Sequence, residues 1–154
     1  RPILKKIDII QLINKSLDFI KLSSKNSINL INKVNNKFIN GDEDQLNRVF
    51  INLIKNSEES LLERSQKEAN FKGNIDIEIN DNNDYIIVKI KDNGTGITDA
   101  KKAMTPYFTT KKTGTGLGLP IVTKIINEHS GNFSIRNKSD NTGAVVTISL
   151  PKYA

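Results

Sequence analysis

The stretch 42–97 reads DEDQLNRVFINLIKNSEESLLERSQKEANFKGNIDIEINDNNDYIIVKIKDNGTGI, and along it the apolar side chains change from a helical to a strand spacing. In its first part they recur every three or four positions, which predicts a helix from Asp42 to about Arg64 with acidic residues stabilising its start. A polar loop is predicted at 65–73. The patterns at 74–80 and 85–91 then predict two strands joined by a tight turn.

The segment before this stretch predicts one helix and one hairpin. Residues 8–20 carry an apolar stripe at helical spacing, and Asp8 is a suitable N-cap. Residues 27–41 hold two short apolar runs on either side of Asn35-Asn36. Because asparagine favours turns, this arrangement predicts a β-hairpin that reverses at the two asparagines.

The segment after the stretch predicts a further helix and two more strands. The helix has Pro120 in its first turn, where proline is tolerated, and stops near Gly131. Strands are predicted at 133–137 and 144–150. Helices and hairpins are segregated along the chain and do not alternate regularly, so the fold class is predicted to be an α+β sandwich.

Composition excludes several classes of function. The 154 residues include no cysteine and one histidine, which excludes disulfides, thiol catalysis, cysteine-based zinc sites and histidine clusters. The net charge of +6 comes from lysines that are scattered along the chain. Aromatic residues that could stack on bases are few and tryptophan is absent, so no specific nucleic-acid partner is expected. No apolar run reaches the roughly 18–20 residues of a membrane span. The chain starts with Arg1 and not with methionine, and we expect it to be a piece of a longer protein.

A first group of polar residues lies on the long predicted helix. Arg48, Asn52 and Asn56 are spaced by four and share one face, away from the apolar stripe. An asparagine side-chain oxygen can coordinate Mg²⁺ beside a polyphosphate without adding charge. A solvated helix face would show the same pattern.

A second group, Asp92-Asn-Gly-Thr-Gly-Ile97, directly follows a predicted strand. An aspartate here can accept a hydrogen bond from an amino group such as the exocyclic amine of adenine. Gly94 and Gly96 allow the backbone to turn sharply and to approach a ligand. An ordinary turn is the alternative, because Asn-Gly is a common turn dipeptide.

A third group, Gly114-Thr-Gly-Leu-Gly-Leu119, opens a predicted helix. Backbone N–H groups at such a helix start can hold phosphate, with Lys111 and Lys112 just upstream. The spacing fits neither the dinucleotide-binding G-x-G-x-x-G pattern nor the Walker A loop. A flexible glycine loop remains the alternative.

In order and spacing, these groups resemble the catalytic ATP-binding domain of sensor histidine kinases, within the superfamily of gyrase, Hsp90, histidine kinases and MutL. Asn52–Ser60 resembles the N box, Asp92–Ile97 and Gly114–Leu119 the two glycine boxes, and Pro106–Lys111 the F box. The form Pro-Tyr-Phe-Thr-Thr-Lys is most similar to the nitrogen-regulation, NtrY-like kinases. The resemblance implies a Bergerat-type fold, which is a two-layer sandwich of a mixed β-sheet against about three helices.

The resemblance also implies the cofactors ATP and Mg²⁺ and a set of roles. Asn56 would coordinate Mg²⁺ with Asn52 assisting, Asp92 would bind the adenine amine, and Lys111 would lie near the phosphates. Residues 100–115 would form a lid over ATP, anchored by Phe108. The implied cofactor-binding residues are Asn52, Asn56, Asp92, Gly94, Gly96, Ile97, Phe108, Thr109, Thr110, Lys111, Gly114, Thr115, Gly116, Leu117, Gly118, Leu119 and Thr147, and the implied catalytic residues are Asn52, Asn56 and Lys111.

One departure from the superfamily bears on the reaction. Its hydrolysing branches place a glutamate, the base for water, where this chain has Asn52. The resemblance therefore implies transfer of the γ-phosphate to a histidine on a separate dimerisation domain, and relay to the receiver domain of a response regulator. His129 follows the last box, and we expect a structural role for it at a helix end.

The resemblance further implies a domain at 8–154, preceded at 1–7 by the end of a linker from the phosphoacceptor domain. We expect a cytoplasmic, monomeric fragment whose parent is anchored in the bacterial inner membrane. Three alternatives remain open from the sequence: an ATPase or a serine kinase on the same fold, a nucleotide-sensing module without catalysis, and a basic nucleic-acid-binding module.

Overall fold

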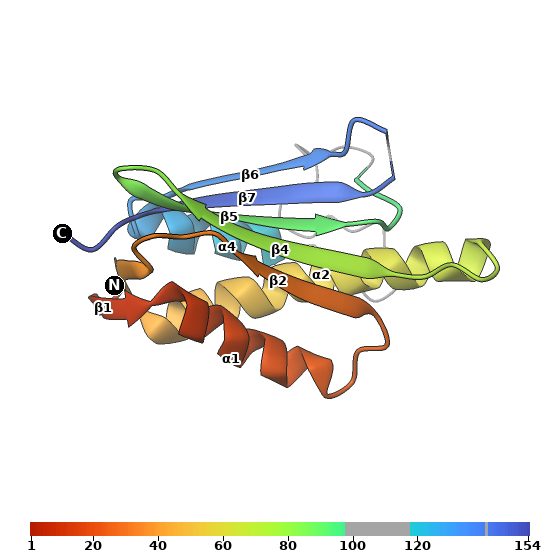
Figure 1. Ribbon diagram of the computed structural model, residues 1–154, viewed down its shortest axis with the longest axis horizontal. Coiled ribbons are helices and arrows are strands. Elements are labelled where there is room, and N and C mark those ends of the chain that lie inside the picture. The colour runs from red at the N-terminus through yellow and green to blue at the C-terminus, as the bar shows by residue number, and fades with distance from the viewer. Residues whose placement is uncertain (98–117, 141) are drawn as a thin grey trace.

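The computed structural model describes residues 1–97, 118–140 and 142–154, and every structural statement refers to these residues. Figure 1 shows the arrangement of the elements in space. In chain order they are β1 (Lys5–Asp8), α1 (Ile9–Lys21), β2 (Ser27–Asn32), β3 (Phe38–Gly41), α2 (Glu43–Lys67), β4 (Asn74–Asp81), β5 (Tyr85–Asp92), α4 (Gly118–Glu128), β6 (Asn132–Asn137) and β7 (Ala144–Pro151).

Five strands form the main sheet, in the order β2-β4-β5-β7-β6. The β2–β4 pair is parallel and the other three pairs are antiparallel, so the sheet is mixed. The three described helices lie on one face of it (Figure 1). The predicted α+β sandwich is confirmed, with three helices in the part of the chain that the structure describes.

The core lies between the sheet and the helices, because strand alternation turns every second side chain toward them. Ile75, Ile77 and Ile79 of β4 are fully buried, and the apolar residues of β5 on the same face, Ile86, Val88 and Ile90, are at most 1% exposed. From the helix side, Phe50 and Leu53 of α2 are equally buried. Burial of each such side chain contributes about 1.5–3 kcal/mol relative to leaving it in water.

The predicted hairpin at 27–41 is wrong. β2 pairs in parallel with β4, whereas β3 pairs antiparallel with β1, a short strand that the sequence pattern did not predict. The two asparagines do not close a tight turn. The backbone N–H groups of Asn35 and Asn36 donate to the Asp81 carboxylate at the end of β4, so this stretch carries the chain from one sheet to the other.

The other elements agree with the sequence pattern within a few residues. Asp8 caps α1, accepting from the backbone N–H of Ile10 at 3.0 Å. Helix α2 continues three residues past Arg64, to Lys67, where i,i+4 ion pairs such as Arg64–Glu68 support the last turns.

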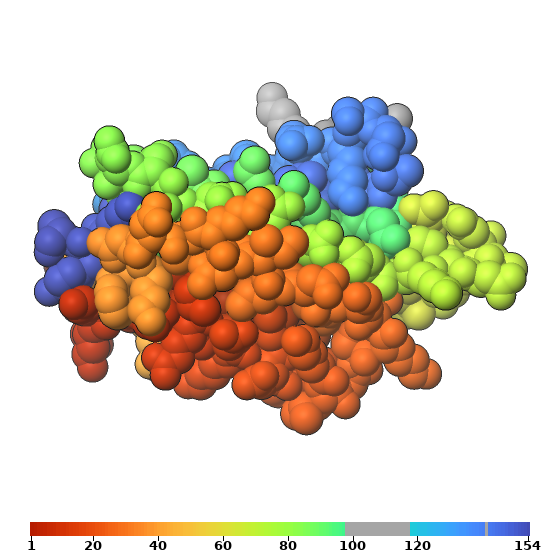
Figure 2. All heavy atoms as spheres, in the orientation of Figure 1, coloured from red at the N-terminus to blue at the C-terminus, as the bar shows by residue number. Residues whose placement is uncertain are grey.

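The N-terminal segment, expected to end a linker, packs partly on the domain. β1 covers residues 5–8, and the backbone N–H of Ile3 donates to the Asp42 carboxylate at 2.9 Å. In the space-filling view the N-terminal part of the chain, red to orange, covers the lower part of the visible face (Figure 2). Among the described residues there is no helix whose length and hydropathy would suit a membrane crossing.

Candidate nucleotide site

The described site residues gather where the end of β5 meets the middle of α2. A small cavity of about 30 Å³ opens there. Strand β7 and the start of α4 close its other sides. It is lined by Leu53, Asn56, Ser57, Ser60, Asp92, Gly96, Ile97, Leu119, Ile135, Ala144 and Val146.

Asp92 is the buried carboxylate of this cavity. It is the last residue of β5, on the face that the strand turns toward the helices, and it is 3% exposed. Its Oδ1 accepts from the backbone N–H of Gly94 at 2.9 Å and of Ala144 at 3.3 Å, and the Ser57 side chain donates to it as well. Burial raises the pKa of Asp92 above its ordinary value, although these hydrogen bonds oppose the shift.

The loop after Asp92 approaches α2 so closely that it needs glycine. A Cβ on Gly94 would lie 2.2 Å from the Ser60 hydroxyl and 2.7 Å from the carbonyl carbon of the same residue. The hydroxyl of Ser60 in turn accepts from the backbone N–H of Thr95 at 2.9 Å. Gly96 has a φ of +80°, a conformation that side-chain-bearing residues rarely adopt.

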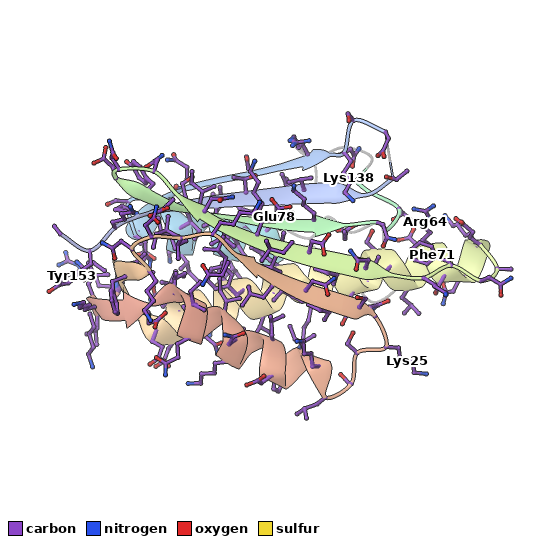
Figure 3. All side chains as sticks on the ribbon, in the orientation of Figure 1. Lys25, Arg64, Phe71, Glu78, Lys138 and Tyr153 are labelled. Carbon is purple, nitrogen blue, oxygen red and sulfur yellow. The ribbon has the colours of Figure 1, made fainter. Side chains whose placement is uncertain are left out.

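Arg64 holds the start of the same loop from the end of α2. Its Nη1 donates to the backbone oxygen of Asn93 at 2.7 Å, and its guanidinium lies 4.7 Å from the centre of the Phe71 ring. Figure 3 shows Arg64 and Phe71 close together at this end of the sheet. The Asn93 side chain binds the first residue of β4, accepting from the backbone N–H of Asn74 at 2.8 Å.

Asn52 and Asn56 lie one helical turn apart in α2, and both are half-buried. Asn56 lines the cavity. A Cβ on Gly118, the first residue of α4, would come 3.8 Å from Asn56 Nδ2, an ordinary contact. The tertiary structure thus brings the N-box helix beside the end of the second glycine box.

Thr147 does not share this site. In β7 the residues that line the cavity are Ala144 and Val146, and successive residues of a strand point to opposite faces. Thr147 therefore lies on the other face of the sheet, in register with Lys89 and Ser134. The expectation that Thr147 contacts the base is therefore wrong, because its side chain is on the face of the sheet opposite to the cavity.

Eight expected site residues lie outside the described part of the chain. They are Phe108, Thr109, Thr110, Lys111, Gly114, Thr115, Gly116 and Leu117. Of the second glycine box, the structure describes Gly118 and Leu119, and Leu119 lines the cavity.

Six cavity-lining residues were not predicted as site residues: Leu53, Ser57, Ser60, Ile135, Ala144 and Val146. Ser57 and Ser60 follow Asn56 at positions that face the cavity, so their signal was the continuation of the polar face. Ala144 contributes its backbone N–H, which no side-chain pattern reveals.

The described residues include no cluster of three or more acidic, histidine or cysteine side chains that could hold a metal ion. Asn56 offers a neutral amide oxygen at the cavity edge. Mg²⁺ retains waters and takes phosphate oxygens readily, so a single protein ligand of this kind fits a metal that arrives with a polyphosphate.

Comparison with known proteins places these features in context. Residues 41–154 match the family model described as histidine kinase-, DNA gyrase B- and HSP90-like ATPase. An NtrY-like sensor histidine kinase of Rickettsia bellii is 35% identical over 150 residues, which are 96% of this chain and 23% of that protein. Sporulation kinase A of Bacillus subtilis is 38% identical over 117 residues, 75% of this chain and 18% of that protein.

Solved structures agree with the fold. The catalytic domain of the histidine kinase ThkA, in a nucleotide-free form, superimposes with a TM-score of 0.76 at 28% identity, covering 97% of this chain and 96% of that one. The mycobacterial sensor histidine kinase MprB gives a TM-score of 0.80 at 20% identity, over 97% and 98% of the two chains, which supports the fold alone. The chain spans about a quarter or less of the curated relatives that it matches.

Proposed function

The chain belongs to the family of histidine kinase-, DNA gyrase B- and HSP90-like ATPases and is the catalytic ATP-binding domain of a sensor histidine kinase. We propose that its cavity binds the adenine of ATP and that the domain passes on the terminal phosphate. The γ-phosphate of ATP is delivered to a histidine on a separate dimerisation domain of the parent protein. From there it passes to the receiver domain of a response regulator.

The observation that carries the proposal is the buried Asp92 carboxylate at the cavity. One oxygen is occupied by backbone donors of Gly94 and Ala144, while the side chain faces a cavity otherwise lined mostly by apolar groups. An apolar cavity with one well-placed acceptor suits a flat base that carries an amino donor, and its volume of about 30 Å³ means that the walls move apart as the base enters. Asp92 therefore binds the exocyclic amine of adenine, and Ile97, Leu119 and Val146 pack against the ring.

The phosphates lie toward Asn56 and the N-terminus of α4. Gly118 stands next to Asn56, and the first N–H groups of a helix attract anions. Asn56, assisted by Asn52, holds Mg²⁺, which supplies neutralisation of the phosphate charge. Lys111 and the glycines at 114 and 116 would complete the phosphate contacts from the segment outside the described residues.

The residue types on α2 favour transfer over hydrolysis. Asn52 stands one turn before Asn56 and cannot act as a base for water, since an amide does not accept a proton near neutral pH. Catalysis then depends on positioning and charge neutralisation. An external imidazole that reaches the γ-phosphate is its own nucleophile, and the site need not supply a base.

The surroundings of the domain are proposed on the same grounds. The chain before β1 leads toward the histidine-bearing domain, and the catalytic unit includes β1 as well as residues 8–154, because Lys5–Asp8 pair with β3. The domain works on the cytoplasmic side, where ATP is available, with the parent protein anchored in the inner membrane.

The test combines two measurements on the chain. The chain is incubated with γ-labelled ATP and magnesium, with and without the dimeric histidine-bearing domain of an NtrY-like kinase. We expect acid-labile label on that domain and little free phosphate from the chain alone. Rapid phosphate release without the partner would indicate an ATPase, label on serine would indicate a serine kinase, and binding of ATP without any transfer would indicate a sensing module.

A further inference from the structure

Asn137, the last residue of β6, holds the far end of the loop 92–97 with both atoms of its carboxamide. Its Oδ1 accepts from the backbone N–H of Ile97 at 2.6 Å, and its Nδ2 donates to the backbone oxygen of Ile97 at 2.5 Å. The two partners fix the amide orientation, because an N–H can only donate and a carbonyl can only accept. The side chain thus makes the same pair of hydrogen bonds that a residue of an antiparallel strand would make, one position beyond the end of β6.

This pair of hydrogen bonds connects the β6–β7 hairpin to the loop 92–97, and both contribute residues to the cavity. Across the β6–β7 pair, Asn137 stands in register with Ala144, whose backbone N–H binds Asp92. Ile97, Asp92 and Ala144 all line the same cavity. The β6–β7 hairpin therefore contacts both ends of the loop 92–97. The backbone of Ala144 binds the Asp92 carboxylate at the start of the loop, and Asn137 binds the backbone of Ile97 at its end.

The rest of the loop depends on other partners. Ser60 and Arg64 of α2 hold Thr95 and Asn93, which precede Gly96. Gly96 has the backbone freedom to swing the next residue, and a Cβ on Gly96 would lie 2.8 Å from the Asn137 Oδ1. Ile97, the residue after Gly96, makes its backbone hydrogen bonds to Asn137.

We infer that Asn137 is a positioning residue for nucleotide binding: by fixing the backbone of Ile97, it sets where Ile97 stands in the wall of the cavity that the base enters. This inference rests on the proposed function, which places adenine in that cavity. The hydrogen bonds of Asn137 are exposed to solvent, so water can replace them in the free protein. Without Asn137 the segment must be ordered at the moment of binding, and affinity falls although the fold remains.

The experiment measures dissociation constants of ATP and ADP by calorimetry, together with melting temperatures without nucleotide. We expect Asn137→Ala to weaken both nucleotides by the same factor, about five- to thirtyfold, the cost of ordering roughly one residue of backbone. The melting temperature should change by less than about 2 °C, because water takes over the exposed hydrogen bonds. The matched control is Asn132→Ala, at the opposite, exposed end of β6, which should change neither quantity.

A second variant distinguishes the loss of the hydrogen-bond pair from the effects of side-chain size and of charge on binding. Asn137→Asp keeps the size and the acceptor for the Ile97 N–H, but at neutral pH it loses the donor and repels the Ile97 oxygen. We expect a loss at least as large as for alanine and equal for ATP and ADP, whereas simple charge repulsion would grow with the number of phosphates. Wild-type affinity in either variant, or a loss confined to ATP, would overturn the inference. If the wild-type chain binds no adenine nucleotide, the proposed function itself fails.

Discussion

The imidazole of His129, just beyond the end of α4, accepts a hydrogen bond on Nε2 from the backbone N–H of Asp42, the N-cap of α2, at 3.0 Å. Its Nδ1 lies 2.8 Å from the backbone oxygen of Ile125 and must carry the proton, because a carbonyl only accepts. The residue is 5% exposed. His129 thus joins the two helices that carry Asn56 and Gly118, in agreement with the structural role expected for it.

Replacement of His129 by alanine should lower the free energy of unfolding. The change removes two hydrogen bonds of a buried ring and leaves the Asp42 N–H without its partner, which costs about 2–3 kcal/mol. Urea titration followed by circular dichroism measures it. Glu128→Ala, at an exposed neighbouring position, is the control and should stay within about 0.5 kcal/mol of wild type. Equal midpoints for His129→Ala and wild type would contradict this role.

Asp42 should make stability depend on pH. Hydrogen bonds from the backbone N–H groups of Ile3 and Gln45 hold the pKa of Asp42 below its ordinary value of 3.8. A carboxylate with a lowered pKa stabilises the fold above its ordinary pKa, and this contribution is lost as the pH falls through the lower value of the folded state. Asp42→Asn removes the charge and keeps one oxygen for the Gln45 N–H of the cap, whereas the exposed Ile3 N–H exchanges its carboxylate partner for water. Its deficit against wild type should be below about 1 kcal/mol at pH 7 and should shrink below about pH 4. A deficit that is constant with pH would be the contrary result.

Asp92→Asn should abolish nucleotide binding while the fold persists. An asparagine that keeps its oxygen on the Gly94 N–H presents an amide donor to the amino group of adenine. Two facing donors cost about 3 kcal/mol, a hundredfold or more in affinity. Because burial disfavours the charge at this position, the neutral side chain should not lower the melting temperature. Calorimetry with ATP is the measurement, with Asp140→Asn in the exposed β6–β7 loop as control; unchanged affinity would remove Asp92 from the adenine site.

Asn56→Ala should weaken ATP binding only when magnesium is present. The amide oxygen lost is the proposed protein ligand of the metal, so we expect about a tenfold rise in the dissociation constant with Mg²⁺. With EDTA in place of magnesium, variant and wild type should bind alike. Lys55→Ala, on the exposed neighbouring position of α2, is the matched control. An equal loss with and without magnesium would assign Asn56 to direct phosphate contact.

Gly94 and Gly118 should respond differently to alanine. A Cβ on Gly94 overlaps Ser60, including its backbone, so Gly94→Ala should lower the free energy of unfolding by about 1–3 kcal/mol. A Cβ on Gly118 meets Asn56 Nδ2 at an ordinary 3.8 Å, and alanine favours the helix, so Gly118→Ala should be neutral or stabilising by up to about 1 kcal/mol. Urea titration of both variants compares them directly; equal destabilisation would show that crowding at Gly94 is relieved by movement.

The elements that were predicted correctly from sequence have strong local patterns. Helices α1 and α2 and the β4–β5 hairpin show periodic burial over eight residues or more, and their caps and turns lie within the same few residues. The segment 27–41 was misassigned because its two strands pair with partners far away in sequence. β2 adds to the edge of the main sheet in parallel with β4, and a parallel register leaves no turn signal.

The sequence by itself determined the chemistry: an aspartate after a strand, asparagines on one helix face and glycines at two turns are local patterns whose residue types limit the ligand. Only the tertiary structure decided which backbone groups complete the site. The N–H of Ala144 on Asp92, the amide of Asn137 on Ile97 and the parity that turns Thr147 to the other face all depend on how strands pair. Pairing brings together residues 40 or more positions apart, and side-chain periodicity carries no record of that register.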